Sequence, residues 1–313
     1  VQQPVNASIL QLGASNQPRI VTVFSVTGGV CNSPIATINI PACCRRNNVT
    51  DIAAQSFTPQ NGITYNLLGT STNITNGTYT GITFVVNGTV NINAARFIDC
   101  NFLMCDDARV NIGQDNIDYT FDANNTQFNT FSPNFMWDGI FAQSIPLTQK
   151  RITFQLASVS NSRNGLNITN GIGASGLINI RNSTFDRNGS HLNIELEQNQ
   201  VQNSSQLFTV RDNQFTCSTP LIENVNGLST TGTAVRLRNL QRLALPNPGF
   251  TFGPQNLIQS ANIGLDVSRS HLNIQRNTFE KIVTALQPVL GINISSDEGI
   301  AVKVDAQRFG WQN

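Results

Sequence analysis

A hydrophobic pattern returns along this chain about every 30 residues, a spacing typical of one stacked unit in repeat proteins. The pattern is an apolar residue, any residue, a second apolar residue, four residues of any kind, and then phenylalanine. With looser copies included, the closing apolar residues fall at 97, 128, 159, 185, 215, 243, 279 and 309. The strict copies are Val90-Ile92-Phe97, Ile178-Ile180-Phe185, Phe208-Val210-Phe215, Leu272-Ile274-Phe279 and Val302-Val304-Phe309. This repeat predicts one supersecondary unit stacked many times.

Each copy reads as a strand followed by a turn. Apolar and polar residues alternate in 177–180 and 272–275, as in a strand with one buried face. The residues that follow, such as 181–184, are Asn, Arg, Ser and Thr, and Asn favours turns because it tolerates left-handed backbone angles. No segment has a sustained apolar stripe at helical spacing. The pattern therefore predicts an all-β chain, folded as a parallel β-solenoid of about 30 residues per coil.

Stacked coils bring equivalent positions to about 4.8 Å from each other, so that closing residues stack on one another. Large apolar rungs are favourable because they bury much area and interlock. Asparagines at equivalent turn positions are expected to form a second ladder of amide hydrogen bonds. The predicted core ladder consists of Phe97, Phe128, Phe185, Phe215, Phe279 and Phe309.

Over residues 86 to 313 the repeat resembles that of the right-handed parallel β-helix superfamily, in its geometry and not in a signature motif. That superfamily includes pectate lyases, polygalacturonases, phage tailspikes and many secreted surface proteins. Phe102, Cys105, the run 135–140 and the Asn-x-Phe turns look more narrowly like the secreted β-helix proteins of gliding and biofilm-forming bacteria. The resemblance implies a right-handed β-helix in a secreted surface protein.

Residues 1 to 85 read differently from the repeat region 86–313. They contain two alternating strands, at 21–26 and 36–40, and a stretch rich in Thr, Asn and Gly at 71–80. Because an open coil is an unpaired sheet edge, this segment is expected either to cap the first coil or to pair with a neighbouring subunit by strand addition.

The repeat runs to Phe309 with no capping helix after it, so an open coil edge is expected to allow head-to-tail assembly with another copy. The chain begins with Val1 and not with Met. We therefore expect that a signal peptide has been removed.

Low charge argues against several functions. Charged residues make up 12% of the chain and the net charge is +1, so nucleic-acid binding through phosphate neutralisation is not expected. No apolar stretch reaches the roughly 20 residues that span a bilayer. An extracellular or cell-surface location is expected.

Cysteine content favours disulfides, because the number of cysteines is even, 6, in a chain that reads as exported. Cys100 with Cys105 is one expected pair, and Cys31 with Cys43 or Cys44 is another; buried free thiols are the alternative. The disulfide candidates are Cys31, Cys43, Cys44, Cys100, Cys105 and Cys217.

Eleven N-x-S/T triplets make a secreted chain a candidate glycoprotein. The candidate acceptors are Asn6, Asn48, Asn73, Asn76, Asn87, Asn124, Asn167, Asn182, Asn188, Asn203 and Asn293.

Convincing catalytic motifs are missing. Cleavage of polysaccharides needs carboxylates, as an acid pair in hydrolases or with Ca²⁺ in lyases. Stacking at the coil period predicts that Asp107 lies near Asp138, and Asp106, Asp107 and Asp138 are the catalytic candidates. Solvated loop acids or a structural Ca²⁺ site are the preferred interpretation, and no other cofactor or metal is expected.

His191 and His271 each stand in Ser-His-Leu-Asn-Ile, which indicates equivalent strand starts.

The sequence thus favours a non-enzymatic structural protein. We expect an extracellular filament or adhesive-layer subunit that self-associates through β-helix edges and N-terminal strands. Its expected partners are copies of itself and surface polysaccharide. The alternative is a carbohydrate-binding or polysaccharide-cleaving β-helix of the tailspike or lyase type.

Overall fold

The chain is all-β in the part that the computed structural model describes, and no helix there is suited to crossing a membrane. It divides into two units, Val1–Arg45 and Arg46–Asn313. In the first unit, β1 (Arg19–Thr27) and β2 (Val30–Ile40) form an antiparallel hairpin. The described residues are 19–27, 30–40, 44–113, 119–143, 150–169, 177–195, 207–238, 250–268, 272–281, 292–295, 302–305 and 308–310.

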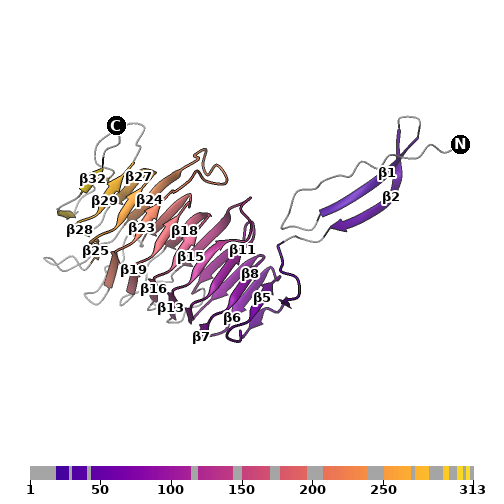
Figure 1. The fold of residues 1–313 in the computed structure, drawn as a ribbon, viewed down its shortest axis with the longest axis horizontal. Coiled ribbons are helices and arrows are strands. Elements are labelled where there is room, and N and C mark those ends of the chain that lie inside the picture. The colour runs from indigo at the N-terminus through magenta and orange to yellow at the C-terminus, as the bar shows by residue number, and fades with distance from the viewer. Residues whose placement is uncertain are drawn as a thin grey trace. The chain divides into compact units, whose positions relative to one another are not determined.

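The second unit is a parallel β-helix of three sheets (Figure 1). Each coil passes through the three sheets in turn, and every strand pairs in parallel with its equivalents in the coils before and after. Sheet 1 contains β7 (Gly77–Thr80), β10 (Ala95–Ile98), β13 (Tyr119–Asn124), β16 (Lys150–Gln155), β19 (Leu177–Arg181), β22 (Leu207–Arg211), β25 (Phe250–Phe252), β28 (Leu272–Gln275) and β31 (Val302–Asp305).

Sheet 2 contains β3 (Thr50–Ile52), β5 (Thr64–Leu67), β8 (Thr83–Val86), β11 (Asn101–Met104), β14 (Gln127–Thr130), β17 (Ser158–Ser160), β20 (Thr184–Asp186), β23 (Gln214–Thr216), β26 (Leu257–Gln259), β29 (Thr278–Glu280) and β32 (Arg308–Gly310). Sheet 3 contains β4 (Ser56–Phe57), β6 (Ser71–Ile74), β9 (Thr89–Ile92), β12 (Arg109–Ile112), β15 (Trp137–Gln143), β18 (Ser162–Thr169), β21 (Ser190–Glu195), β24 (Thr231–Arg238), β27 (Ala261–Ser268) and β30 (Ile292–Ser295). The all-β, parallel β-helix class predicted from the repeat is confirmed.

The solenoid begins before residue 86, the expected boundary. β3 pairs with β5 and β5 with β8, all in parallel. The Thr-, Asn- and Gly-rich stretch forms β6 and β7, whose inward residues include the buried Ile74 and Tyr79. Only every second residue of such a strand faces the core, so the exposed polar residues hide the apolar rungs in the composition.

Coil length varies more than the expected period of about 30 residues. Hydrogen-bonded equivalents lie 18 residues apart between Asn73 and Asn91, and 30 apart between Ser183 and Asn213. The step from Asn213 to Asn256 takes 43 residues. Sheet pairing sets the position of each strand, whereas loops such as 217–230, between β23 and β24, absorb the extra length.

Aromatic residues of sheet 2 stack inside the solenoid. The ring centroids of Phe84 and Phe102 are 4.7 Å apart, as are those of Phe102 and Phe128. The same inner column continues in register through Val159, Phe185, Phe215, Ile258 and Phe279, and the backbone of Phe309 pairs in register with Phe279.

Phe97 was expected to be a rung of this column, and this prediction is wrong. Phe97 is fully buried but lies in sheet 1, and Phe102 occupies the corresponding position in sheet 2. The pattern that ends at Phe97 joins sheet 3 to sheet 1, whereas the pattern that ends at Phe185 joins sheet 1 to sheet 2. Different corners of the coil share one apolar spacing, so the sequence pattern does not distinguish them. Position 243 lies outside the described residues.

The predicted asparagine ladder is present in the turn between sheets 1 and 2. Asn213, Asn256 and Asn277 are almost completely buried. Nδ2 of Asn213 donates to Oδ1 of Asn256 at 3.1 Å, and Nδ2 of Asn256 donates to Oδ1 of Asn277 at 2.9 Å. Each also donates to a main-chain carbonyl of the preceding coil, so that the ladder satisfies backbone groups that sheet pairing leaves free.

Candidate functional site

Three carboxylates, two from one turn and one from a separate loop, converge on Arg163, at the start of β18. Nη2 of Arg163 lies 3.1 Å from Oδ1 of Asp106 and 2.9 Å from Oε2 of Glu223, while Nη1 pairs with Asp107. Asp106 and Asp107 follow β11, and Glu223 lies in loop 217–230. Arg163 therefore joins two parts of the chain that meet only in the folded solenoid.

Asp138, in β15, lies beside this network. Its N–H donates to the carbonyl of Ala108 at 3.0 Å, and its carboxylate is 3.5 Å from Nη1 of Arg109. Burial raises the pKa of Asp138, with Arg109 and Arg163 opposing the shift and the charge of Asp107 adding to it. The three catalytic candidates are thus gathered in one place, and each of them faces an arginine.

Other acids of the region lie elsewhere. Oδ1 of Asp99 accepts a hydrogen bond from Asn125, and Asp122 pairs with Arg96 on the face of sheet 1. Within the described ranges, no three His, Cys, Asp or Glu side chains form a group that could hold a metal ion. The expected structural Ca²⁺ stays a prediction.

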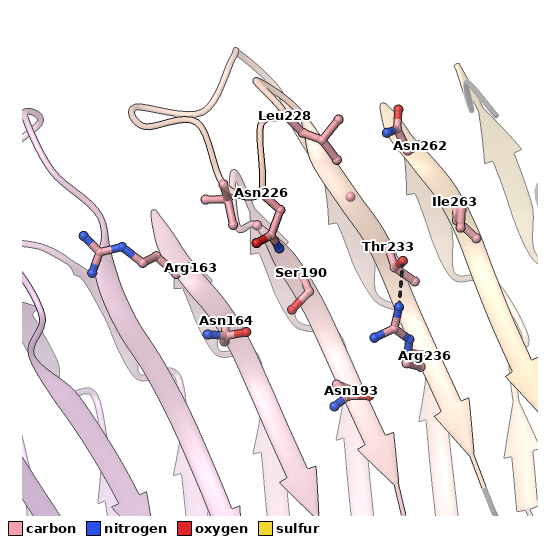
Figure 2. Close-up of a pocket in the computed structure, with 13 residues that line it drawn as sticks. Arg163, Asn164, Ser190, Asn193, Asn226, Leu228, Thr233, Arg236, Asn262 and Ile263 are labelled. Atoms are coloured by element: carbon pink, nitrogen blue, oxygen red, sulfur yellow. Dashed lines mark hydrogen bonds between the residues drawn. The ribbon is translucent and has the colours of Figure 1, made fainter. Parts of the chain in front are cut away.

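A groove of about 590 Å³ opens on the outer face of sheet 3 next to Arg163 (Figure 2). Its floor consists of outward side chains from consecutive strands of the sheet, because positions such as Asn164, Ser190 and Thr233 lie in register. The floor residues are Arg163 and Asn164 of β18, Ser190 and Asn193 of β21, Thr233 and Arg236 of β24, and Asn262 and Ile263 of β27.

Loop 217–230 forms one wall of the groove through Val225, Asn226 and Leu228. The carboxylate of Asp186 holds the start of this loop, because it accepts hydrogen bonds from the N–H and the hydroxyl of Ser218 at 2.9 and 2.7 Å. Glu223 holds its middle, since its second oxygen accepts the N–H of Met136 at 3.0 Å. Beneath the loop, a small apolar cluster contains Met136, Cys217 and Leu221. Loop 217–230 is therefore anchored to the solenoid at its start and at its middle.

The floor is polar but close to neutral. Nε of Arg236 lies 3.1 Å from Oδ2 of Asp266, and its Nη2 donates to Oγ1 of Thr233 at 3.4 Å. Nδ2 of Asn193 donates to Oδ1 of Asn167 at 2.9 Å, while Oδ1 of Asn193 accepts no hydrogen bond from any described residue. Arg163 faces three carboxylates, a formal charge of −2, and Arg236 shares Asp266 with Arg238, a formal charge of +1, so the charges around the groove sum to −1 and its groups mainly offer hydrogen bonds.

His191 is completely buried beneath this floor. Its Nδ1 is 3.2 Å from Nδ2 of Asn188, and its Nε2 is 3.3 Å from Oγ1 of Thr231. The Asn188 amide is a donor, so Nδ1 accepts and Nε2–H donates, which is the arrangement of a neutral imidazole. Burial lowers the pKa of His191 to about 3, against a smaller opposing effect of Asp186. The imidazole therefore packs in the core as a neutral, hydrogen-bonded side chain.

Acid is expected to destabilise the fold through His191. The unfolded chain binds a proton there below a pKa of about 6.5, whereas the folded chain does so only near 3, so stability rises with pH between these values. Going from pH 7.5 to pH 5 should cost about 2 kcal/mol from this residue. The free energy of unfolding, measured in urea across that range, should change less with pH for His191→Gln than for the wild type. Parallel profiles would contradict this role.

One candidate glycosylation site is wrong. Asn188 is completely buried, and its Oδ1 accepts hydrogen bonds from the N–H and the hydroxyl of Ser162, so no glycan fits there in the folded chain. Asn6 and Asn203 lie outside the described residues, and Asn293 lies in β30. The exposed acceptors are Asn48, Asn73, Asn76 and Asn182, and the half-buried ones are Asn87, Asn124 and Asn167.

The expected pairing of Cys100 with Cys105 is also wrong. Cys100 and Cys217 are buried free thiols, whereas Cys44 and Cys105 are disulfide-bonded. Cys100 precedes β11 and Cys105 follows it, and five residues of extended strand span about 16 Å, which is beyond the reach of a disulfide. Cys43, a candidate partner of Cys31, lies outside the described residues.

Comparisons with known proteins leave the site to be judged on its geometry. The chain matches no family model and no curated protein. Among solved structures, it is similar to a chain described as ORF18 of Geobacillus virus E2, with 12% identity and a TM-score of 0.21 over 93% of this chain. This chain spans 56% of that one. A likeness this low supports no argument about fold or function.

Proposed function

We propose that this chain is a non-enzymatic carbohydrate-binding β-helix that holds a neutral polysaccharide on the outer face of sheet 3. The groove is the observation that carries the proposal. Successive strands of the floor, about 4.8 Å apart, each present amide, hydroxyl or guanidinium groups, which suits the regularly repeated hydroxyls of a sugar polymer.

Charge favours a neutral ligand over an acidic one. Arg163 with its three carboxylates carries a formal charge of −2, and Arg236, Arg238 and Asp266 together carry +1, so the groove surroundings have no excess of positive charge to attract an anion. No carboxylate lines the groove within the described residues, and the Asp107 and Asp138 pair lies beyond its end, against arginines. Binding without cleavage is therefore the favoured activity.

An extracellular location belongs to this proposal. It is supported by the disulfide-bonded Cys44 and Cys105, because disulfides persist mainly outside the reducing cytosol. Self-association through coil edges and N-terminal strands, the other function expected from the sequence, stays a prediction. Glycan binding is preferred over self-association because the described residues form a groove that suits it.

Affinity electrophoresis should retard the wild type in gels that contain at least one neutral polymer from a panel of mixed-linkage β-glucan, galactomannan, dextran and neutral xylan. Polygalacturonate and alginate should retard it less. Thr233→Trp fills the groove and should weaken binding at least tenfold. The control is Thr209→Trp on the outer face of sheet 1, which should bind like the wild type.

Retention should persist at high salt, because the contacts are hydrogen bonds and not ion pairs. Reducing-end assays of the same mixtures should detect no cleavage. The proposal fails if no neutral polymer retards the protein, or if the two tryptophan variants bind equally.

A further inference from the structure

A second hollow, of about 610 Å³, lies on the same outer face of sheet 3 but nearer to the first coils. It is formed by β4, β6 and β9, whereas the groove is formed by β18 to β27. Its lining contains only hydroxyl, amide and aliphatic side chains and no charged group among the described residues. These residues are Ser56, Ser71, Asn73, Ile74, Thr75, Asn76, Asn91 and Asn93.

Hydrogen bonds fix the polar groups of this hollow. Nδ2 of Asn91 donates both to Oγ of Ser71 and to Oδ1 of Asn73 at 2.8 Å. Oδ1 of Asn76 accepts the N–H of Ala94 at 3.2 Å. A ligand thus meets oriented groups that lose little side-chain entropy on binding.

A series of polar contacts, which includes the salt bridge between Arg109 and Asp138 at 3.5 Å, runs from the hollow to the groove. Nδ2 of Asn111 donates to Oδ1 of Asn91 at 3.1 Å, and Nε of Arg109 donates to Oδ1 of Asn111 at 2.7 Å. Nδ2 of Asn164, on the groove floor, donates to the carbonyl of Asp138 at 3.3 Å in the strand next to Arg109. The outer face of sheet 3 therefore continues without a break in its polar contacts.

Between the two sites, an arginine of β12 stacks on an aromatic ring of β15. The guanidinium of Arg109 lies over the ring of Phe141, with its central carbon 3.6 Å from the ring centroid. Stacking of this kind presents the plane of the guanidinium outward, as a platform against which a sugar ring can lie. β9 and β18 are three strand steps apart in the sheet, or about 14 Å.

We propose that the hollow is a second binding site for a neutral, linear polysaccharide, so that one polymer chain lies along the solenoid axis and occupies the hollow and the groove together. This inference rests on the proposed function of the groove. The shared sheet face, the neutral linings and the bonded path between them all point to one extended ligand. Because linked sites bind with a high effective concentration, polymer chains that reach both sites bind more tightly than short ones.

The test uses size-fractionated oligosaccharides of the neutral polymer that retards the wild type, with affinities measured by calorimetry. Protein made in a bacterial host without N-glycosylation keeps Asn73 and Asn76 unmodified. We expect the wild type to bind oligosaccharides long enough to fill the groove and reach β9, six strand steps or about 29 Å from β27, at least tenfold more tightly than shorter ones that only fill the groove. Ser71→Trp, which fills the hollow, should remove this gain and leave short oligosaccharides bound as before. Thr83→Trp, on the outer face of sheet 2, is the matched control.

The outcomes separate the two proposals. If long and short oligosaccharides bind equally, or if Ser71→Trp keeps the gain while Thr233→Trp removes binding, the second site is wrong and the groove stands. If no neutral polymer binds the wild type, the proposed function fails and the second site fails with it. Circular dichroism of each variant verifies that the tryptophan has not unfolded the coil.

Discussion

Replacing Asn213 with alanine should lower the free energy of unfolding by about 4 kcal/mol. Nδ2 of Asn213 donates to the carbonyl of Ile180 at 3.0 Å and to Asn256, and its Oδ1 accepts the N–H of Ser183 at 3.0 Å. Alanine would remove the donor to the buried Ile180 carbonyl and the acceptor of the buried Ser183 N–H, whereas Oδ1 of Asn256 would keep the backbone N–H of residue 213 at 3.1 Å. Each unsatisfied buried group costs about 1–3 kcal/mol, and a small cavity adds to the loss.

Urea unfolding followed by circular dichroism measures this loss. Asn179→Ala is the matched control, because Asn179 lies on the outer side of β19, the strand that precedes the equivalent turn one coil earlier, and its change should stay within about 0.5 kcal/mol. Since each coil of a solenoid is stabilised by its neighbours, Asn213→Ala is also expected to split the transition into two steps. Equal midpoints for both variants would show that the buried amide ladder contributes little.

Much of the fold follows from the repeat because a solenoid is determined by local periodicity. Alternation sets which residues face inward, and stacking then places equivalent residues in contact. The amide ladder at Asn213 and the proximity of Asp107 to Asp138 follow from the same reasoning. The ladder needs only the order of the coils, whereas the proximity of Asp107 to Asp138 also needs the local coil length to be close to the expected period.

Other features depend on which corner of the coil a pattern belongs to. Phe97 and Phe185 close the same apolar pattern but lie in different sheets, because one spacing serves more than one corner. Asn188 reads as an acceptor triplet, yet it fills a buried turn position where its amide bonds to Ser162. Short motifs contain no information about burial, so these errors could not be avoided from the sequence alone.

The groove was beyond sequence reasoning for a different reason. Arg163 contacts Asp106 and Glu223 across 57 and 60 residues of chain, through turns of irregular length. No periodic signal relates such residues. The one usable hint was the long interval between Phe215 and the next rung of sheet 2, Ile258, which marks an inserted loop, and that loop became the wall of the groove.

Gly139→Ala should destabilise the protein by about 4 kcal/mol and disturb the groove at the same time. Gly139 lies in β15 with φ +137°, and a Cβ built on it would stand 1.9 Å from the carbonyl oxygen of Asn164. That contact cannot relax through a side chain, because both groups belong to paired backbones at a point where the β15–β18 register shifts. Alanine must therefore push β18 away and move Asn164 on the groove floor.

Gly62→Ala separates the two causes of this effect. Gly62 also has a positive φ, +74°, but its Cβ would meet no atom within 4 Å. It should therefore cost only the backbone strain, about 1 kcal/mol, and leave glycan binding unchanged. Urea unfolding and affinity electrophoresis of both variants measure the difference. If Gly139→Ala is no more destabilising than Gly62→Ala, β18 can move at Asn164 without a loss of stability. The close approach of β15 and β18 then does not fix the floor of the groove.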